Sequence, residues 1–406
     1  MTAAAAAATP PDRRADLDWL RVLAFGLLIL YHAGMAFSGW SWHIEDAESP
    51  VWLREAMRFT NRWRMPLVFV VSGAAIALAL GRRTIGGFAA DRARRLLLPL
   101  VFGMAVIVPP QVYAERVHRG QFAGSFVEWL PQAFTGVYPA GNLSWHHLWF
   151  LAYVLVLTAL LLPCFLWART PAGAARLDAA SRVVARHHLH WLAPLPLIAI
   201  QLWLAPVSSN PNGLVGDWVG LAWHGTLLLY GALVFRSGDL LAALERWRWL
   251  ALAVGVAVYA ILHQSFLAGT VRPRIAPEDR ALFTALGNLD TVAWLFAIIG
   301  FARRHLTARP AFLARATEAV YPFYILHQTV TVVAVHWLVR SGLPVGAKFA
   351  LAAFITFAGT WLLYEFVVRR VDILRPLFGM RPRLPPAPAR AQIAAANPDG
   401  GNTWVR

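Results

Sequence analysis

Ionisable residues interrupt several long apolar runs of this chain, at positions that lipid would keep away from water. They are Arg21, His32, His147, His224, His263, Asp290, His327, His336 and Glu365. A charge at the centre of a bilayer costs roughly 2.5–3.5 kcal/mol on insertion scales, so such residues usually face the interior of a helix bundle and often serve function. Histidine can also take up and release a proton near neutral pH. The pattern therefore indicates proton chemistry inside a membrane domain.

The first apolar run carries the most informative spacing. His32 follows Arg21 by eleven residues, close to three helical turns, so the two side chains share a face and lie about 16 Å apart along the axis. Asp18 precedes Arg21 by three residues and can pair with it. We expect Asp18 and Arg21 at the inner end of a span and His32 near its middle. Structural roles for all three are the alternative.

Arg92 and Arg95 stand at the start of another apolar run and point the same way on a helix. Arginine forks bind phosphate well, although plain positive-inside anchoring explains the same residues. His147 is expected near the external surface, His327 half-way across, and Glu365 near the cytoplasmic side. A phosphate-bearing donor from the cytoplasm and an acceptor hydroxyl from outside would fit this arrangement. For His224, His263, Asp290 and His336 we favour structural or interfacial roles.

Helices must position these residues, and the composition predicts membrane helices. Hydrophobic residues make up 58% of the 406, charged residues only 14%, and mean hydropathy is +0.52. Soluble proteins are nearer a quarter charged. Ten runs are long and apolar enough to predict spans of about 20 residues: Trp19–Gly39, Met65–Leu80, Leu96–Tyr113, Leu148–Trp167, Trp191–Val207, Trp218–Phe235, Trp249–Leu267, Phe283–Phe301, Val320–Leu338 and Phe349–Val368. The second and fifth are shortest and could be bent or re-entrant.

The charges between these runs predict the orientation. With the N-terminus in the cytoplasm, cytoplasmic segments hold 25 Lys and Arg against 11 in the opposite loops. This bias is typical of the positive-inside rule and alternates through all ten spans. We therefore predict an all-α polytopic bundle of about ten transmembrane helices with both termini cytoplasmic. The net charge of +16 reflects this topology rather than nucleic-acid binding.

One membrane domain, residues 16–380, is expected between a disordered segment, 1–15, and a disordered cytoplasmic tail, 381–406. The single cysteine, Cys164, excludes an intramolecular disulfide and a cysteine metal site. The chain has no phosphate-binding P-loop, no Gly-x-Ser-x-Gly elbow and no His-Glu-x-x-His motif, which weakens ATP-driven transport and serine hydrolysis. No metal site and no bound cofactor are predicted.

Several strings resemble the acyltransferase-3 family of membrane O-acyltransferases. They are Leu17-Asp18-Trp19-Leu20-Arg21 with Leu30-Tyr31-His32, Arg92-Ala93-Arg94-Arg95, His147-Leu148-Trp149-Phe150-Leu151 and Tyr321-Pro322-Phe323-Tyr324-Ile325-Leu326-His327. Two further stretches, from Leu98 to Gln111 and from Tyr364 to Gly379, are similar to the branch of the family that acts on periplasmic glucans. The resemblance covers residues 15 to 380. Trp19 and Val22 depart from it, because many members have glycines there.

The resemblance implies acyl transfer across a bacterial inner membrane, with acyl-CoA as co-substrate and an exported carbohydrate as acceptor. The acyl group would be succinyl or acetyl. His32 then becomes the catalytic histidine, helped by Arg21 and Asp18, and Arg92 and Arg95 hold the donor. His147, His327 and Glu365 are expected to bind substrate. His32 acts either as general base or through an acyl-histidine intermediate.

Two other classes of function use the same residues. A proton-coupled transporter of a carbohydrate or small molecule would use buried His, Asp and Glu as a relay. A structural partner of a glucan synthase would need none of them for chemistry.

Overall fold

The computed structural model describes residues 14–81, 84–267 and 279–383, and within these it is all-helical, with only an isolated bridge between Val137 and Leu143. The elements are α1 (Ala15–Met35), α2 (Val51–Gly81), α3 (Ile85–Arg92), α4 (Leu98–Phe102), α5 (Pro109–His118), α6 (Phe126–Trp129), α7 (Trp149–Leu160), α8 (Leu162–Arg169), α9 (Pro171–Arg186), α10 (Pro194–Leu204), α11 (Trp218–Arg236), α12 (Gly238–Leu267), α13 (Arg280–His305), α14 (Ala311–Leu338), α15 (Val345–Leu362) and α16 (Leu374–Leu377). Short π-helical stretches (Ala93–Leu97, Gly103–Ile107, Leu363–Val368) and 3₁₀ turns, among them η4 (His146–Leu148), connect them.

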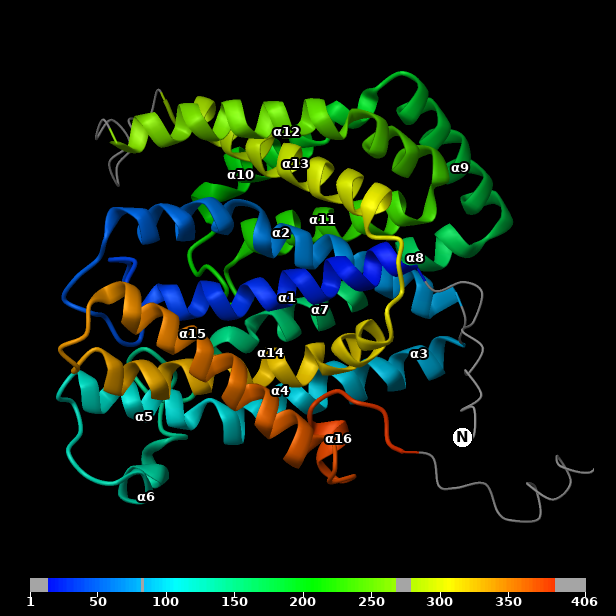
Figure 1. The fold of residues 1–406 in the computed structure, drawn as a ribbon. Helices are drawn as coiled ribbons and strands as arrows, with labels where there is room; N and C mark the ends of the chain where they lie inside the picture. Colours follow the sequence, from blue (N-terminus) through cyan, green and yellow to red (C-terminus); the bar gives the residue numbers. More distant parts are fainter. Residues whose placement is uncertain (1–13, 82–83, 268–278, 384–406) are drawn as a thin grey trace, which may run out of the picture.

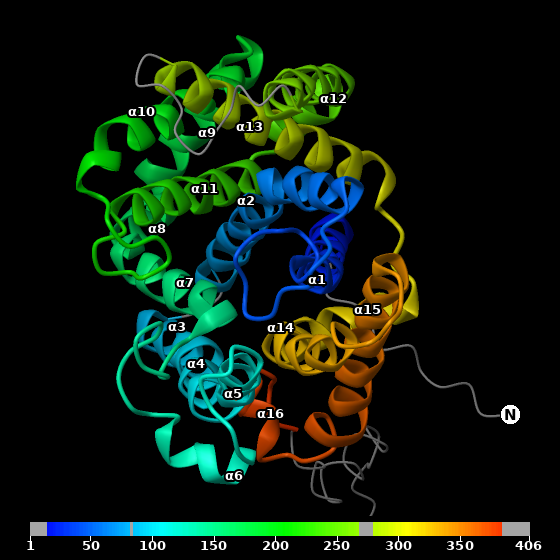
Figure 2. The same ribbon diagram turned by 90° about the vertical axis from the view of Figure 1, so that its left-hand side faces the viewer.

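The long helices run roughly along one direction, as Figure 1 shows. One end of the bundle holds the start of α1, where the Arg14 guanidinium donates to the carbonyl of Phe235 over 3.4 Å. The opposite end holds the loops after α1 and α5, where Lys348 pairs with Asp46 over 2.7 Å. We call these the arginine end and the loop end. Viewed from the loop end, α1 lies between α2 and α14, and α12 and α13 form an outer layer (Figure 2).

Seven helices in the described part of the chain are long and apolar enough to cross a membrane, or eight if the bent pair α7–α8 counts as one span. The all-helical membrane fold is thus confirmed, whereas the count of about ten is not. α12 and α14, which contain the expected spans Trp249–Leu267 and Val320–Leu338, are not among the seven, although they lie alongside the others (Figure 1). The orientation of the termini stays a prediction.

Several predicted boundaries were wrong in informative ways. The second span is not short: α2 begins at Val51, so the second half of the expected loop 40–64 is helical and Arg64 lies well inside the helix. The bend falls in the fourth span, where α7 and α8 meet at 54° beside Pro163. Proline lacks the N–H that an uninterrupted helix needs. The expected domain limits stay untested, and residues 1–13 and 384–406 lie outside the described residues.

Two glycines allow α2 and α11 to cross closely. A Cβ on Gly73 would stand 1.8 Å from the carbonyl oxygen of Leu228, and a Cβ on Gly231 would stand 1.8 Å from that of Val70. Small residues at a crossing let helix backbones touch, which is a main source of packing energy inside a membrane. The sequence therefore fixes α11 against α2, the helix that carries Arg64.

Asp217 begins α11 as its N-cap. Its buried carboxylate accepts from the backbone N–H groups of Gly220 and Asn212, each over 2.9 Å, and from the hydroxyl of Tyr153 over 2.5 Å. Burial alone would raise the pKa of this carboxyl, but these hydrogen bonds outweigh it and hold the pKa below its ordinary value. The cap ties α11 to α7.

Candidate active site

Two of the predicted histidines meet in the centre of the bundle. His32 on α1 and His327 on α14 approach with Nδ1 of His32 3.0 Å from Nε2 of His327, and their ring centroids are 4.8 Å apart. The two residues are 295 positions apart in the chain, and they meet because α1 packs directly against α14.

The surrounding carbonyls determine where the protons sit. Nδ1 of His327 lies 2.7 Å from the carbonyl oxygen of Tyr324, which can only accept, so this nitrogen carries a proton. Its Nε2 must then accept from His32, and Nδ1 of His32 also donates to the carbonyl of Leu28 over 3.0 Å. The lone pair of His32 is thereby left on Nε2. That atom has no hydrogen-bond partner among the described residues, and it is the basic atom of the pair.

His147 joins this pair from η4. Its Nε2 donates to the carbonyl of Ile325 over 3.0 Å, while the hydroxyl of Tyr324 donates to the carbonyl of His147. These reciprocal bonds clasp η4 to α14. The ring of His147 stands 5.2 Å from that of His327, centroid to centroid, and its buried Nδ1 has no partner in the described part of the chain. Three imidazoles from three segments therefore form one cluster, the histidine cluster: His32, His147 and His327.

Arg64 is a residue of this region that the sequence analysis missed. Its guanidinium lies over the ring of Tyr31, 3.4 Å from the centroid, and within electrostatic reach of His32 and His327. The side chain is buried at 5% exposure, and no carboxylate pairs with it among the described residues. A buried charge without a counter-ion is costly, so the site is suited to an anionic group. The sequence analysis missed it because α2 begins earlier than predicted, at Val51, which places Arg64 inside a helix and not in a loop.

The predicted arginines gather elsewhere, around a cavity of about 750 Å³ at the arginine end. Arg21, Arg92 and Arg95 all line it, together with Asp18. Arg21 pairs with Asp18 over 3.5 Å, and Asp91 pairs with Arg95 over 3.0 Å and with Arg92 over 3.4 Å. We call this space the arginine cavity. Among the described residues six arginines line it against three carboxylates, because Arg14, Arg375 and Arg381 join the three named and Glu318 joins the two aspartates.

An aromatic layer stands between the arginine cavity and the histidine cluster. Phe25 and Phe150 line the cavity, and Tyr324 packs on both, with centroid distances of 5.6 Å and 5.8 Å. Tyr324 also contacts the ring of His147, at 5.7 Å between centroids. Phe25 lies two helical turns before His32 on α1. A cavity rich in arginine and a cluster of imidazoles are thus arranged in series along one bundle.

Glu365 is placed apart from this series. It pairs with Arg315 over 2.6 Å and with Arg369 over 2.9 Å. It is not among the residues that line the arginine cavity in the described part of the chain. These ion pairs explain its position without a substrate, and its role in substrate binding stays a prediction.

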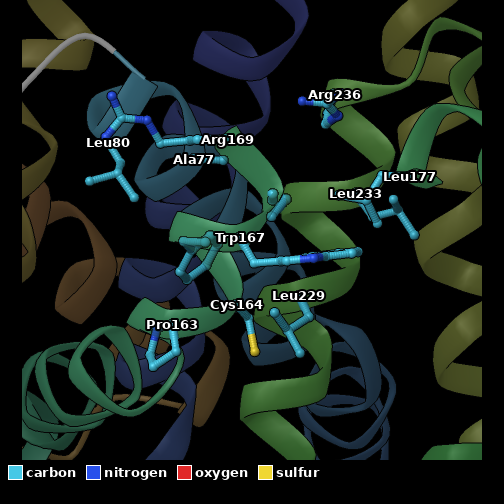
Figure 3. A pocket seen from close by; sticks show the side chains of 13 residues that line it. Ala77, Leu80, Pro163, Cys164, Trp167, Arg169, Leu177, Leu229, Leu233 and Arg236 are labelled. Atoms are coloured by element: carbon cyan, nitrogen blue, oxygen red, sulfur yellow. The ribbon is translucent and has the colours of Figure 1, made fainter. Parts of the chain in front are cut away.

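A second cavity, of about 590 Å³, lies beside α8 and α11 (Figure 3). Its lining is mostly apolar and includes Cys164, Trp167, Leu229 and Leu233, with Arg169 and Arg236 as its cations. It is lined by none of the predicted site residues.

A family model described as an acyltransferase domain, that of the acyltransferase-3 family, matches residues 14–365. The chain belongs to this family. It is an acyltransferase with membrane helices. The expected family is confirmed, and a transporter is no longer the simplest explanation of the buried histidines.

The curated relatives match a shorter stretch of the chain than the family model does. The chain is 27% identical over 154 residues to glucans biosynthesis protein C of Escherichia coli strain K12, and equally to that of strain SMS-3-5. The alignment covers 37% of this chain and 38% of each relative, well under two thirds of their length. No solved structure matches the chain.

Proposed function

We propose that this acyltransferase moves an acyl group from a cytoplasmic acyl-CoA to a hydroxyl of an exported carbohydrate, in a bacterial inner membrane. The observation that carries the proposal is the order of features along the bundle: a cationic cavity, an aromatic layer, and a histidine cluster with a free basic nitrogen. A phosphate-rich donor and a neutral hydroxyl acceptor need those two environments. The names of the relatives support a glucan as acceptor.

The arginine cavity would hold the phosphates of the donor. Arg92 and Arg95 supply planar forks, and Arg21 adds a third cation oriented by Asp18. The thioester would then extend toward Phe25 and Phe150, where the cavity meets the aromatic layer. Acyl transfer needs the thioester to pass this layer, so we expect Tyr324 and Phe25 to shift when the donor binds.

His32 would act as the general base. Its Nε2 takes the proton of the acceptor hydroxyl while the hydroxyl oxygen attacks the thioester carbonyl carbon. The C–S bond then breaks, and the imidazolium returns the proton to the leaving thiolate. General-base assistance typically contributes about 10² to 10⁴-fold. Attack on the carbonyl by Nε2 itself would instead give an acyl-histidine, which the acceptor hydroxyl then cleaves.

Among the candidate acyl groups, the position of Arg64 favours succinyl over acetyl. The carboxylate of a succinyl group would supply the anion that this buried guanidinium lacks, whereas acetyl would leave the charge unpaired. We therefore propose Arg64 as the residue that distinguishes the two donors.

Labelled succinyl-CoA and acetyl-CoA, supplied with periplasmic glucan to the purified protein in membranes, test the function. We expect label on the glucan with wild type and with the exposed control His305→Ala, and none with His32→Ala at matched expression. Transfer that survives in His32→Ala would move the catalytic role, to His147 or His327. Uptake of glucan without covalent label would instead support a transporter.

A further inference from the structure

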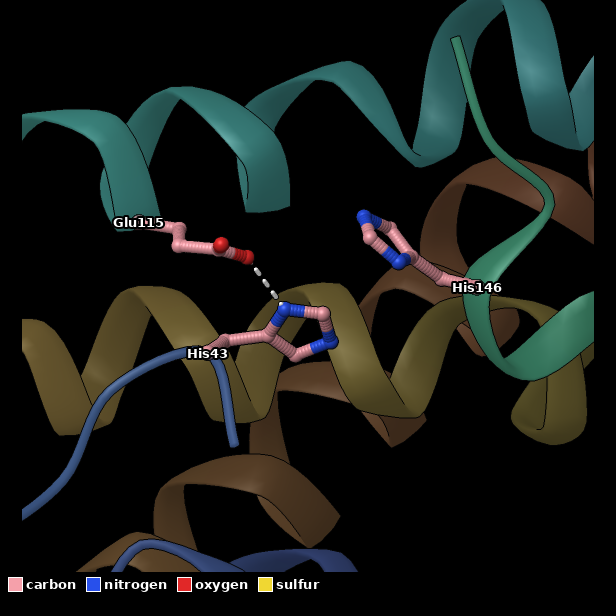
Figure 4. A group of neighbouring side chains, drawn as sticks. All are labelled: His43, Glu115 and His146. Atoms are coloured by element: carbon pink, nitrogen blue, oxygen red, sulfur yellow. Dashed lines mark hydrogen bonds and ion pairs between the residues drawn. The ribbon is translucent and has the colours of Figure 1, made fainter. Parts of the chain in front are cut away.

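A second group of ionisable side chains lies near the histidine cluster, at the loop end, and the steps above leave it unused. His43 comes from the loop after α1, Glu115 from α5, and His146 from η4. Figure 4 shows the three side chains pointing toward one another from these separate segments. One ligand atom of each lies within 4.8 Å of the other two, and His43 and Glu115 are buried. Two imidazoles and a carboxylate are the ligand set of many catalytic zinc sites.

We propose that His43, Glu115 and His146 form a binding site for a first-row divalent metal ion of the zinc type. This inference does not depend on the proposed function.

The backbone and the side chain of His146 give the strongest local support for this metal site. Its φ of +40° is a backbone conformation that residues other than glycine rarely adopt, and such strain persists where the surrounding structure demands it. Its Nε2 is buried and has no hydrogen-bond partner in the described part of the chain. The ring of His146 stands 4.4 Å from that of His43, centroid to centroid. A strained residue with an unpaired buried nitrogen, grouped with a carboxylate and an imidazole, fits a ligand.

Glu115 already has the support that a metal-binding carboxylate needs. One oxygen, Oε1, pairs with Arg119 over 2.9 Å and accepts from the hydroxyl of Tyr138 over 3.0 Å. The other, Oε2, is directed at Nδ1 of His43, 2.6 Å away. Such outer contacts orient ligands and are a regular part of metal sites. The metal would use Oε2 and leave the contacts of Oε1 in place.

His43 would change its tautomer to bind the ion. A hydrogen-bonded row runs from the carbonyl of Ile107 through Thr329 and Gln111 to Gln328, whose amide donates to Nε2 of His43 over 3.1 Å. This row leaves the proton on Nδ1, where it is shared with Glu115. When the metal binds Nδ1, the ring would change tautomer: Nδ1 gives up its proton and Nε2 takes one, so the imidazole stays neutral. The amide of Gln328 would then turn its oxygen toward the N–H at Nε2, as the partner that ligating imidazoles usually have.

The geometry needs only side-chain movement. Ligand atoms around a tetrahedral zinc with bonds of about 2.0–2.1 Å stand about 3.4 Å apart. At present Nδ1 of His43 and Oε2 of Glu115 stand 2.6 Å apart and the other ligand atoms lie within 4.8 Å, so shifts on the order of 1 Å would bring all three to that spacing. The ion would join three loop-end segments, and His146 directly precedes His147. By fixing His146, the ion would also stabilise the reciprocal hydrogen bonds between His147 and α14. The sequence could not predict this site, because its ligands are distant in the chain and match no metal motif.

The test uses the full chain in detergent, purified with a histidine-free tag, stripped with a chelator and titrated with ZnCl₂ alone. We expect one zinc per chain after desalting, measured by elemental analysis, in wild type and in the exposed control His305→Asn. His146→Asn, which suits a positive φ, and the isosteric Glu115→Gln should each weaken zinc affinity by more than about ten-fold, the lower end of what even an outer contact contributes.

Competition with a chromophoric zinc chelator gives the affinity, and size-exclusion profiles verify that each variant is folded. If only one of the two variants folds, that variant decides. Sub-stoichiometric zinc in wild type, or equal affinity in wild type and the folded variants, would overturn the proposal. A rise in the thermal midpoint with zinc that is absent in the variants would support it independently, because an ion that binds only the folded state stabilises that state.

Discussion

The tautomers of His32 and His327 follow from backbone carbonyls, and this makes the roles of the two rings separable. His327 accepts from His32 and so stabilises the imidazolium that forms when Nε2 takes a proton. We expect His32→Ala to reduce acyl transfer by at least about 10²-fold, the lower range for a general base. His327→Gln keeps an acceptor oxygen and should retain more activity than His327→Phe, which keeps none.

Initial rates with labelled donor at matched expression measure this difference, with KM and kcat separated. The positioning role of His327 predicts that the loss lies in kcat. Equal loss in His327→Gln and His327→Phe, with KM raised and kcat intact, would contradict it and indicate that His327 binds substrate.

Arg64 supports a prediction about the choice of donor. Arg64→Met removes the guanidinium and keeps the apolar stem, so the carboxylate of a succinyl group would lose a charged hydrogen bond of about 1.5–3 kcal/mol. That corresponds to roughly a 10- to 150-fold lower kcat/KM for succinyl-CoA, with acetyl-CoA little changed. Arg54→Met, on the same helix but half-exposed, is the control. An equal loss with both donors would mean that Arg64 stabilises the thioester oxyanion instead.

At the residue scale, the sequence predicted which residues line the site better than it predicted how the helices that carry them pack. The spacing placed Asp18 beside Arg21 and Arg92 beside Arg95, because each pair is local in the chain, and the structure brings both pairs to one cavity. The contact of His32 with His327 depends on packing between helices far apart in the chain, which spacing does not contain. Their catalytic and binding roles stay predictions.

Among the elements, the crossing of α2 and α11 gives the sharpest prediction. Gly231→Ala places a methyl group against the backbone of α2, so we expect a loss of about 1–3 kcal/mol in the free energy of unfolding, typical of overpacking. Gly26→Ala on α1 is matched in chemistry but has nothing within 4 Å of the new Cβ, and it should be neutral or slightly stabilising. Thermal midpoints in detergent compare the two. Equal thermal midpoints for the two variants would show that α2 and α11 can move apart without a loss of stability.

The N-cap of α11 predicts a pH-dependent contribution to stability. The pKa of Asp217 is lowered in the folded protein, so its carboxylate stabilises the fold above the unfolded value of about 3.9 and loses that effect as pH falls through the lower folded pKa. Asp217→Asn removes the charge but keeps the shape, and should cost about 1–2 kcal/mol at pH 7, because the hydrogen bonds to this group then end on a neutral oxygen. The difference in thermal midpoint between wild type and variant should be constant from pH 7 to pH 5.5 and narrow below about pH 4. A difference that widens in acid would contradict this account.

Helix bounds were less predictable than helix existence, for reasons that particular residues explain. Composition alone predicted a loop at 40–64, between the first two expected spans, because Arg54, Arg58, Arg62 and Arg64 are unfavourable in lipid. In the fold Arg54 and Arg58 pair with Glu55 and Arg62 pairs with Asp290, so the helix continues from Val51. Because 40–64 was predicted as a loop, the position of Arg64 within the core was not predicted either. The break at Leu161 lies beside Pro163, and a count of apolar residues does not register a proline inside a span.

For the whole molecule, the order of the arginine cavity and the histidine cluster gives meaning to the predicted orientation. If donor phosphates enter from the cytoplasm, the arginine end must face the cytoplasm and the loop end must face outward. The charge bias of the sequence predicts the same orientation independently. Two separate arguments, one chemical and one topological, therefore make a single claim about which side of the membrane each end occupies.

Single cysteines test that claim, because Cys164 is the only cysteine in the chain. In a Cys164→Ala background, Ala140→Cys places a thiol on the exposed loop after α6, and Ala172→Cys places one near the exposed start of α9. We expect a membrane-impermeant maleimide to label position 140 in intact spheroplasts, and position 172 only after permeabilisation. The reverse pattern would place the arginine end outside, where acyl-CoA is absent, and would exclude the proposed donor route while leaving the histidine chemistry intact. Labelling of both positions in intact cells would mean that the two loops share the outer side, contrary to the bundle in Figure 1.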